Sequence, residues 1–165
     1  MFGKRAGYRT LQFGRALFER QNCELEALAR AYLDGPGLAL FHSLTPRDQR
    51  HSAQTASHLL RAGCVDGELL VAALLHDVGK GDQRLWQRVA YVLLAAGSAP
   101  LLAWTASSRT GWRGAFWRSL HHPDLGSEAA GQAGYSERVA QLIAQHHCSS
   151  NDPDLVALQS ADERA

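Results

Sequence analysis

The stretch VAALLHDVGK, residues 71–80, joins an apolar helical run to side chains that can bind a cation. Residues 71–75 are all apolar, which is typical of a helix buried in a core. His76 and Asp77 follow at once, and Gly79 is expected to end the helix. A buried carboxylate beside an imidazole is costly unless a positive charge pairs with it. The stretch therefore predicts a metal site at a helix end, with further ligands elsewhere in the chain.

Length and composition indicate one domain without a dominant charge. The 165 residues can bury one sizeable core. With 17 Lys and Arg against 16 Asp and Glu, no stable complex with nucleic acid is expected. Cys23, Cys64 and Cys148 are too widely spaced for a disulfide framework or a CxxC zinc site, which is typical of reduced thiols. Because the N-terminus also lacks the apolar core of a secretory signal, we expect a cytoplasmic protein.

Helical spacing and helix-capping residues recur along the chain, without strand alternation. Residues 11–33 have helical spacing, and the sequence DGPG at 34–37 breaks the helix. Side chains suited to the N-cap position precede the later helices: Thr45, Asp66, Ser136 and Asp152. We predict an all-α bundle of seven to nine helices. Residues 1–44 are expected to form a helical extension packed on the main domain, 45–165.

Residues 83–123 differ in composition from the rest of the chain. They contain no acidic residue, but they hold all four tryptophans and five arginines: Arg84, Arg88, Arg109, Arg113 and Arg118. Twenty uncharged residues, 89–108, could span a bilayer by length, but the sequence GSAP at 97–100 interrupts them. We therefore predict a helical hairpin packed in or against the core, without membrane contact. The alternative is an exposed apolar face that contacts a second copy or a membrane surface. A later helix is expected to stop before Pro123, with Asp124 capping a further turn.

Five short elements with histidine or aspartate follow one another along the chain: His51, the HDVGK of 76–80, the HPDLG of 122–126, the pair His146-His147, and the SAD of 160–162. This order resembles the HD superfamily of metal-dependent phosphohydrolases, over roughly seven-tenths of the chain. The resemblance implies that one metal is held by His51, His76, Asp77 and Asp162. It also implies that Asp77 bridges to a second metal, which takes His122 and His146. From the residues alone, His121 and His122 remain alternatives.

The HD-GYP branch of this superfamily differs from the chain at two places. It has a glutamate four residues before the first histidine, associated with a third metal, where this chain has Arg47. It also has a Gly-Tyr-Pro segment after the histidine pair, where this chain continues with residues 148–151, CSSN. A trinuclear centre and specificity for cyclic-di-GMP would depend on those missing residues.

The ligand types themselves favour a transition metal. Imidazoles and carboxylates without a thiolate suit Fe or Mn, and also Zn, Co or Ni, better than an all-oxygen Mg or Ca cage. We expect two such ions in a phosphohydrolase that cleaves a phosphomonoester or phosphodiester of a nucleotide-like small molecule. Asp77 and Lys80 are the expected catalytic residues. Substrate contacts are expected from Lys80, His147, Arg113 and Arg118.

Three other possibilities stay open at this stage. Di-iron oxygenases are built on the same HD scaffold, and the ligands alone do not separate them from phosphohydrolases. A non-catalytic sensor or ligand-binding module would be favoured if Lys80 pointed away from the metal, or if the hairpin closed the pocket. A homodimer is also compatible with the sequence.

Overall fold

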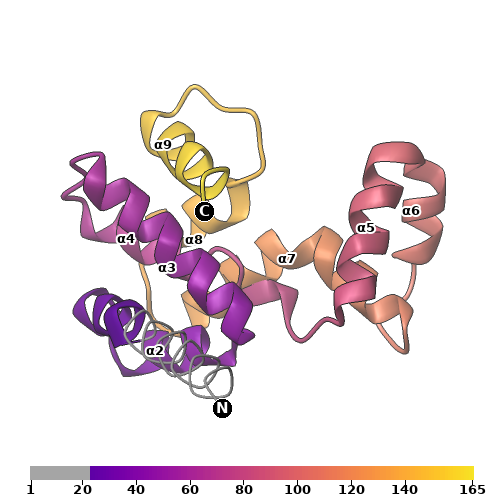
Figure 1. Ribbon diagram of the computed structural model, residues 1–165, viewed down its shortest axis with the longest axis horizontal. Coiled ribbons are helices and arrows are strands. Elements are labelled where there is room, and N and C mark those ends of the chain that lie inside the picture. The colour runs from indigo at the N-terminus through magenta and orange to yellow at the C-terminus, as the bar shows by residue number, and fades with distance from the viewer. Residues whose placement is uncertain (1–22) are drawn as a thin grey trace, which may run out of the picture.

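The computed structural model describes residues 23–165, and every regular element among them is helical (Figure 1). A helical segment over residues 23–32 is followed by α2 (Gly35–Ser43), α3 (Pro46–Arg61), α4 (Gly67–Leu75), the short 3-10 helix η1 (Val78–Lys80), α5 (Leu85–Gly97), α6 (Ala99–Thr105), α7 (Arg113–Gln132), α8 (Glu137–Gln145) and α9 (Pro153–Asp162). The all-α prediction is confirmed. The first part of the predicted helix over 11–33 lies outside the described residues.

The predicted N-caps begin four of these helices. Each side chain accepts a hydrogen bond from a backbone N–H of the first turn, as Asp66 does from Glu68 at 2.9 Å and Asp152 from Asp154 at 2.9 Å. Thr45 and Ser136 do the same at 3.3 Å for α3 and α8. Capping fixes where these helices start, and thereby where their ligand-bearing residues lie.

Helix α4 lies in the hydrophobic core, and residues 69–75 are all buried. Its neighbours are α3, α8, α9 and α2 (Figure 1). A helix that is apolar on every side has to be covered on every side, which explains the uninterrupted apolar run. Because α4 is buried from residue 69 to its end, the residues that follow it, His76 and Asp77, enter the interior as well.

The N-terminal segments add to the same core. Ala29, Leu33, Phe41 and Leu44 are buried in one cluster with the apolar residues of α4, α8 and α9. The boundary at residues 44 and 45 stays a prediction.

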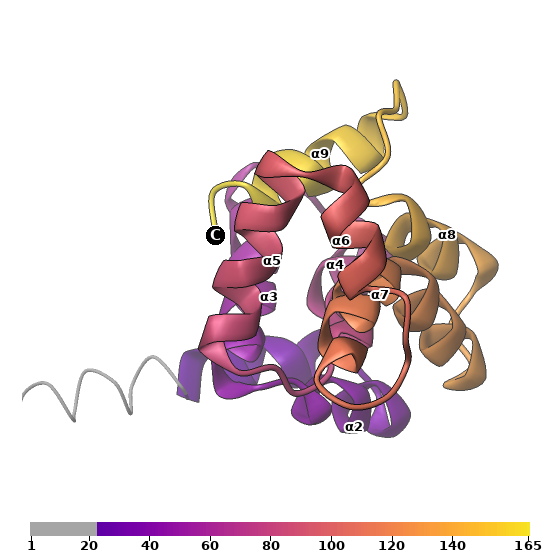
Figure 2. The same cartoon turned by 90° about the vertical axis from the view of Figure 1, so that its right-hand side faces the viewer.

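Helices α5 and α6 form the predicted hairpin, but it does not pack in or against the core. They run side by side and contact chiefly each other and α7 (Figures 1 and 2). None of their described side chains belongs to the core cluster, and Val92 and Leu93 are 64% and 67% exposed. The expectation of core packing was wrong because α2, α3, α8 and α9 already surround α4. None of the helices in the described part of the chain is both long and apolar enough to cross a bilayer.

Helix α7 also differs from the prediction, since it continues through Pro123. A proline inside a helix lacks the N–H that would bond to the carbonyl four residues earlier, here that of Ser119. The break expected before Pro123 was wrong. The Ser119 carbonyl accepts a hydrogen bond from the His122 imidazole instead of from a backbone N–H.

Candidate metal centre

Five helices bring the six predicted metal ligands together beside the C-terminal end of α4. His51 comes from α3 and His122 from α7, while the others lie at or next to the ends of α4, α8 and α9: His76, Asp77, His146 and Asp162. Asp162 Oδ1 is 2.7 Å from His51 Nε2 and 3.2 Å from His76 Nε2. Asp77 Oδ1 is 3.4 Å from His76 Nε2 and 3.6 Å from His122 Nε2. Side chains separated by more than a hundred positions in the sequence therefore meet in one place.

The ligand atoms form two adjoining groups. One consists of His51, His76 and Asp77, and the other of His122, His146 and His147, with the ligand atoms of each group within 4.8 Å of one another. Asp77 is near both groups, since its Oδ2 is 4.0 Å from His51 Nε2 and its Oδ1 is 3.6 Å from His122 Nε2. A carboxylate in this position can bridge two cations.

Three of the imidazoles are oriented in the same way. Nδ1 of His76, His122 and His146 lies 2.7–2.8 Å from the carbonyl oxygen of the residue three positions earlier. A carbonyl can only accept, so Nδ1 carries the hydrogen and the lone pair on Nε2 points into the site. The Nε2 atoms of His122 and His146 face each other at 3.3 Å. Two lone pairs so close are favourable only with a cation between or beside them.

Pro123 contributes to the orientation of His122. The carbonyl of Ser119, which a helical N–H at position 123 would have occupied, accepts from His122 Nδ1 at 2.8 Å. The proline keeps this acceptor free for the imidazole. His121 lies on another side of α7, with its ring 4.7 Å from that of Trp117. Of the two adjacent histidines, His122 is thus the one beside His146.

Unpartnered buried atoms indicate that a cation fits this arrangement. Within the described residues, four buried side-chain polar atoms lack a hydrogen-bond partner, and three of them are His76 Nε2, Asp77 Oδ1 and Asp162 Oδ1. These atoms lie close to charged neighbours but without a hydrogen bond, and a buried polar atom without a hydrogen bond is costly. A divalent metal would satisfy all three at once, and the nitrogen and oxygen donors suit a transition metal.

The local environment keeps four of the predicted ligands, two imidazoles and two carboxylates, in the forms that bind metal. Burial, with the nearby charge of Lys80, lowers the pKa of His122 to about 4, and burial with the charge of His76 lowers the pKa of His146 to about 3. Burial alone would raise the pKa of Asp77, but the charges of His76 and Lys80 outweigh it and hold this pKa below its usual range. The neighbouring imidazoles do the same for the pKa of Asp162. Two neutral imidazoles and two ionised carboxylates result at neutral pH.

Two glycines bring η1 and α7 into close contact. A Cβ on Gly79 would lie 2.1 Å from the carbonyl oxygen of His122 and 2.9 Å from the backbone nitrogen of Gly126. A Cβ on Gly126 would be 3.1 Å from Ile143 Cγ2. The glycines of HDVGK and HPDLG therefore allow the close approach that places Asp77 next to His122.

The other predicted site residues lie in different surroundings. Lys80 Nζ is 2.6 Å from both oxygens of Asp77, and it donates to Oδ2. His147 is exposed next to His146, with ring centroids 3.9 Å apart. Arg118 donates to the carbonyls of Lys80 and Asp82, and Arg113 stacks 3.8 Å from the ring of Trp104. Neither arginine is among the described residues that line the cavities beside the metal ligands.

Two cavities adjoin the ligands. One, of about 480 Å³, is lined by Lys80, His122 and His147 on the ligand side and by Arg47, Tyr91 and Val92 elsewhere, and none of its described lining residues is a carboxylate. The other, of about 390 Å³, reaches His51 and Asp77, and it shares Arg47, Lys80 and Arg88 with the first. Positive side chains thus surround the approach to the ligands.

Sequence reasoning missed Arg47 and Arg88 at this site. Arg47 precedes His51 by four residues in α3, and this spacing puts both on one helix face. The position of Arg47 beside the site could therefore have been predicted from the sequence. Arg88 binds the buried carboxylate of Asp48 with two hydrogen bonds of 2.6 and 2.5 Å. This pair spans forty positions, and no local pattern predicts it.

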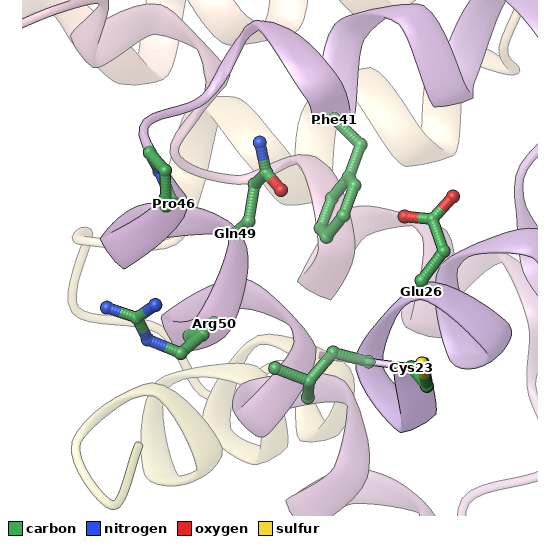
Figure 3. A pocket seen from close by; sticks show the side chains of 7 residues that line it. Cys23, Glu26, Phe41, Pro46, Gln49 and Arg50 are labelled. Carbon is green, nitrogen blue, oxygen red and sulfur yellow. The ribbon is translucent and has the colours of Figure 1, made fainter. Parts of the chain in front are cut away.

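A further cavity lies apart from the ligands. It has a volume of about 410 Å³ and is lined by Cys23, Leu25, Glu26, Phe41, Pro46, Gln49 and Arg50 (Figure 3). None of the predicted site residues is among them, so we assign it no part in the chemistry of the metal centre.

Comparison with known proteins agrees with the ligand geometry. Residues 49–164 match the HD domain family. No curated protein and no solved structure gives a match. The matched range contains all six predicted ligands and covers more than half of the chain. The chain therefore belongs to the HD domain family.

Proposed function

We propose that this protein is a metal-dependent phosphohydrolase that cleaves a phosphate ester of a nucleotide-like small molecule. The observation that carries the proposal is the convergence of His76 Nε2, Asp77 Oδ1 and Asp162 Oδ1, all buried and without hydrogen-bond partners, next to a cavity with positive walls. Membership of a family of metal-dependent hydrolases agrees with this combination.

Two sets of side chains would hold two ions, with Fe or Mn the foremost candidates and Zn, Co or Ni the others. His51, His76, Asp77 and Asp162 would hold one ion, while Asp77, His122 and His146 would hold the second. When bound, two such ions supply a water of lowered pKa and positive charge that stabilises the entering and leaving oxygens of an in-line displacement.

Lys80 and Arg47 are the residues that we assign to the substrate phosphate. Lys80 projects from η1 next to Asp77 and lines both cavities. Arg47 also lines both, and within residues 23–165 no carboxylate forms an ion pair with it. A fixed ammonium group and a guanidinium group can hold phosphate oxygens where negative charge increases during the reaction. Arg113 and Arg118 were our expected contacts, but their present interactions favour structural roles.

The larger cavity supports a substrate with a flat or apolar part beside its phosphate. Its volume of about 480 Å³ is in the range of small-molecule sites. Tyr91, Val92 and Leu120 line it in addition to the charged groups. A nucleobase fits this combination of an aromatic ring, apolar side chains and cations, and His147 would lie at the same wall.

The position of Lys80 favours an enzyme over a sensor module. Lys80 points to Asp77, and the hairpin leaves a cavity open beside the ligands. The test is a screen of phosphomonoesters and phosphodiesters with the metal-reconstituted protein, beside Asp77→Ala and the control Asp82→Asn. Release of phosphate or nucleoside monophosphate by wild type and Asp82→Asn alone would support the proposal. Oxygen uptake coupled to substrate loss, without phosphate release, would identify an oxygenase instead.

A further inference from the structure

The hairpin of α5 and α6 carries an apolar surface that the rest of the described chain leaves open. We call this the hairpin surface, and it consists of Val89, Val92, Leu93, Leu101 and Trp104, each between 46% and 67% exposed. All five belong to residues 89–108, which contain no charged side chain. An exposed apolar patch of this kind is typical of a contact with a partner or a lipid surface.

The charge around the hairpin surface indicates an anionic partner. Residues 83–123 hold five arginines and no acidic residue, whereas the remainder of the chain has 12 basic and 16 acidic side chains. Arg88 is neutralised by Asp48. The other four arginines have no carboxylate partner among residues 23–165: Arg84, Arg109, Arg113 and Arg118. Of these, Arg113 lies on Trp104 of the hairpin surface itself, and positive charge beside an apolar surface attracts negative charge.

Tryptophans and arginines are stacked where α6 meets the start of α7. The Arg113 guanidinium lies 3.8 Å from the ring of Trp104, and that of Arg109 lies 4.5 Å from Trp117. Tryptophan prefers the boundary between headgroups and acyl chains, and arginine prefers anionic headgroups. Stacked pairs of these two residue types next to the hairpin surface therefore suit contact with the headgroup region of a membrane.

We propose that the hairpin surface docks on an anionic phospholipid membrane. A second copy of the chain fits less well, because a twofold contact places the same patch against itself. The Arg113 guanidinium on the Trp104 ring of one copy would then be brought near that of the other copy, and residues 83–123 contain no acidic residue to pair with either. Docking on the surface also suits α5 and α6, which have 13 and 7 residues and cannot cross a bilayer.

Vesicle binding by the full chain tests this proposal. All four tryptophans lie between residues 86 and 117, so tryptophan fluorescence reports on the hairpin and the start of α7 alone. With phosphatidylcholine vesicles that contain phosphatidylglycerol, we expect co-flotation and a blue shift of the fluorescence. Both should weaken with added salt and with phosphatidylcholine alone.

A pair of matched variants separates the hairpin surface from apolar exposure in general. Leu93→Glu should weaken vesicle binding at least about tenfold, because a carboxylate would enter the interface. Val65→Glu should leave binding unchanged, since Val65 is 95% exposed but lies between α3 and α4. Equal helicity of both variants by circular dichroism shows that neither has unfolded.

Three results would overturn the proposal. The first is no binding of the wild type to vesicles with phosphatidylglycerol, and the second is equal binding by Leu93→Glu. The third is a lipid-independent dimer in analytical ultracentrifugation that Leu93→Glu dissociates, since the hairpin surface would then be covered by a second copy.

Discussion

Lys80 Nζ lies 2.6 Å from both carboxylate oxygens of Asp77, the residue that adjoins both groups of predicted metal ligands. The ammonium group and a bound cation therefore compete for the same carboxylate. If the cation bound Asp77, the Lys80 ammonium group would be free to contact the substrate phosphate. Lys80 would then have two roles that a single substitution can separate.

Lys80→Met should bind divalent metal several-fold more tightly, because the competing internal cation is gone. The same variant should lose phosphohydrolase activity by about a hundredfold, the order of a lost electrostatic contact to the reacting group. Competition with a chromophoric chelator measures the affinity, and kcat measures the activity. Weaker metal binding by Lys80→Met would mean that the lysine supports the metal site and does not compete with the cation.

Gly79→Ala should destabilise the protein and reduce metal binding together. The new Cβ would meet backbone atoms of α7 at 2.1 and 2.9 Å, which cannot rotate away. Overpacking of this kind costs about 1–3 kcal/mol of the free energy of unfolding. Gly131→Ala in α7 is the matched control. A Cβ at Gly131 would have no neighbouring atom within 4 Å outside its own helix. This control should raise stability by up to about 1 kcal/mol in urea unfolding. Equal effects of the two substitutions would contradict the close approach of η1 and α7.

The Arg88–Asp48 pair should contribute to stability through the cost of breaking it. Asp48 is 3% exposed, and Arg88→Met would leave its carboxylate buried without a positive partner. We expect a loss of about 3–5 kcal/mol, and partial recovery in the double variant Asp48→Asn with Arg88→Met.

The pH dependence of that loss has a defined sign. Burial alone raises the pKa of Asp48, but the hydrogen bonds from Arg88 and Thr45 outweigh it and lower this pKa below its usual value. In the wild type the pair therefore stabilises the fold above the unfolded pKa of about 3.9, and this stability is lost as the pH falls through the folded pKa. Without Arg88, burial raises the pKa, so the defect of Arg88→Met should shrink toward acid pH. Unfolding curves at two pH values measure this, and a defect that does not change with pH would contradict the assignment.

Metal affinity should depend on pH differently at the two positions. Burial lowers the pKa of His76, but the charges of Asp77 and Asp162 outweigh it and leave this pKa raised above 6.5. A metal must displace that proton, so affinity at the His76 position should rise up to about tenfold per pH unit below the raised pKa. With the pKa of His122 at about 4 and that of His146 at about 3, no such rise is expected at their position between about pH 5 and 8. Metal titrations across this range measure both, and equal slopes would refute the difference.

The sequence alone was sufficient to predict the elements that depend on nearby residues. The uninterrupted apolar run of α4 required a helix covered on all sides, and the N-caps at Thr45, Asp66, Ser136 and Asp152 set four helix starts. The order of histidines and aspartates at helix ends then identified the residues that meet beside α4. These features depend on neighbours within a few positions or on a recurring order of motifs.

Features that depend on distant neighbours were not predictable in the same way. The apolar pattern of α5 and α6 showed that the hairpin has apolar faces, but not that other helices already cover the core. The sequence did not show the neighbours of Arg113 and Arg118, which are Trp104 for one and two backbone carbonyls for the other. The helix break expected before Pro123 failed because His122 supplies the donor that the Ser119 carbonyl would otherwise lack.

The metal content of the purified, metal-reconstituted protein tests the central claim most directly. Elemental analysis after removal of free metal should find two divalent transition-metal ions per chain in the wild type. The control Asp82→Asn should match the wild type, and Asp77→Ala should retain almost none, because Asp77 adjoins both groups of ligands. Wild-type protein without bound metal, or Asp77→Ala with a full complement, would contradict the claim that these imidazoles and carboxylates form a metal centre.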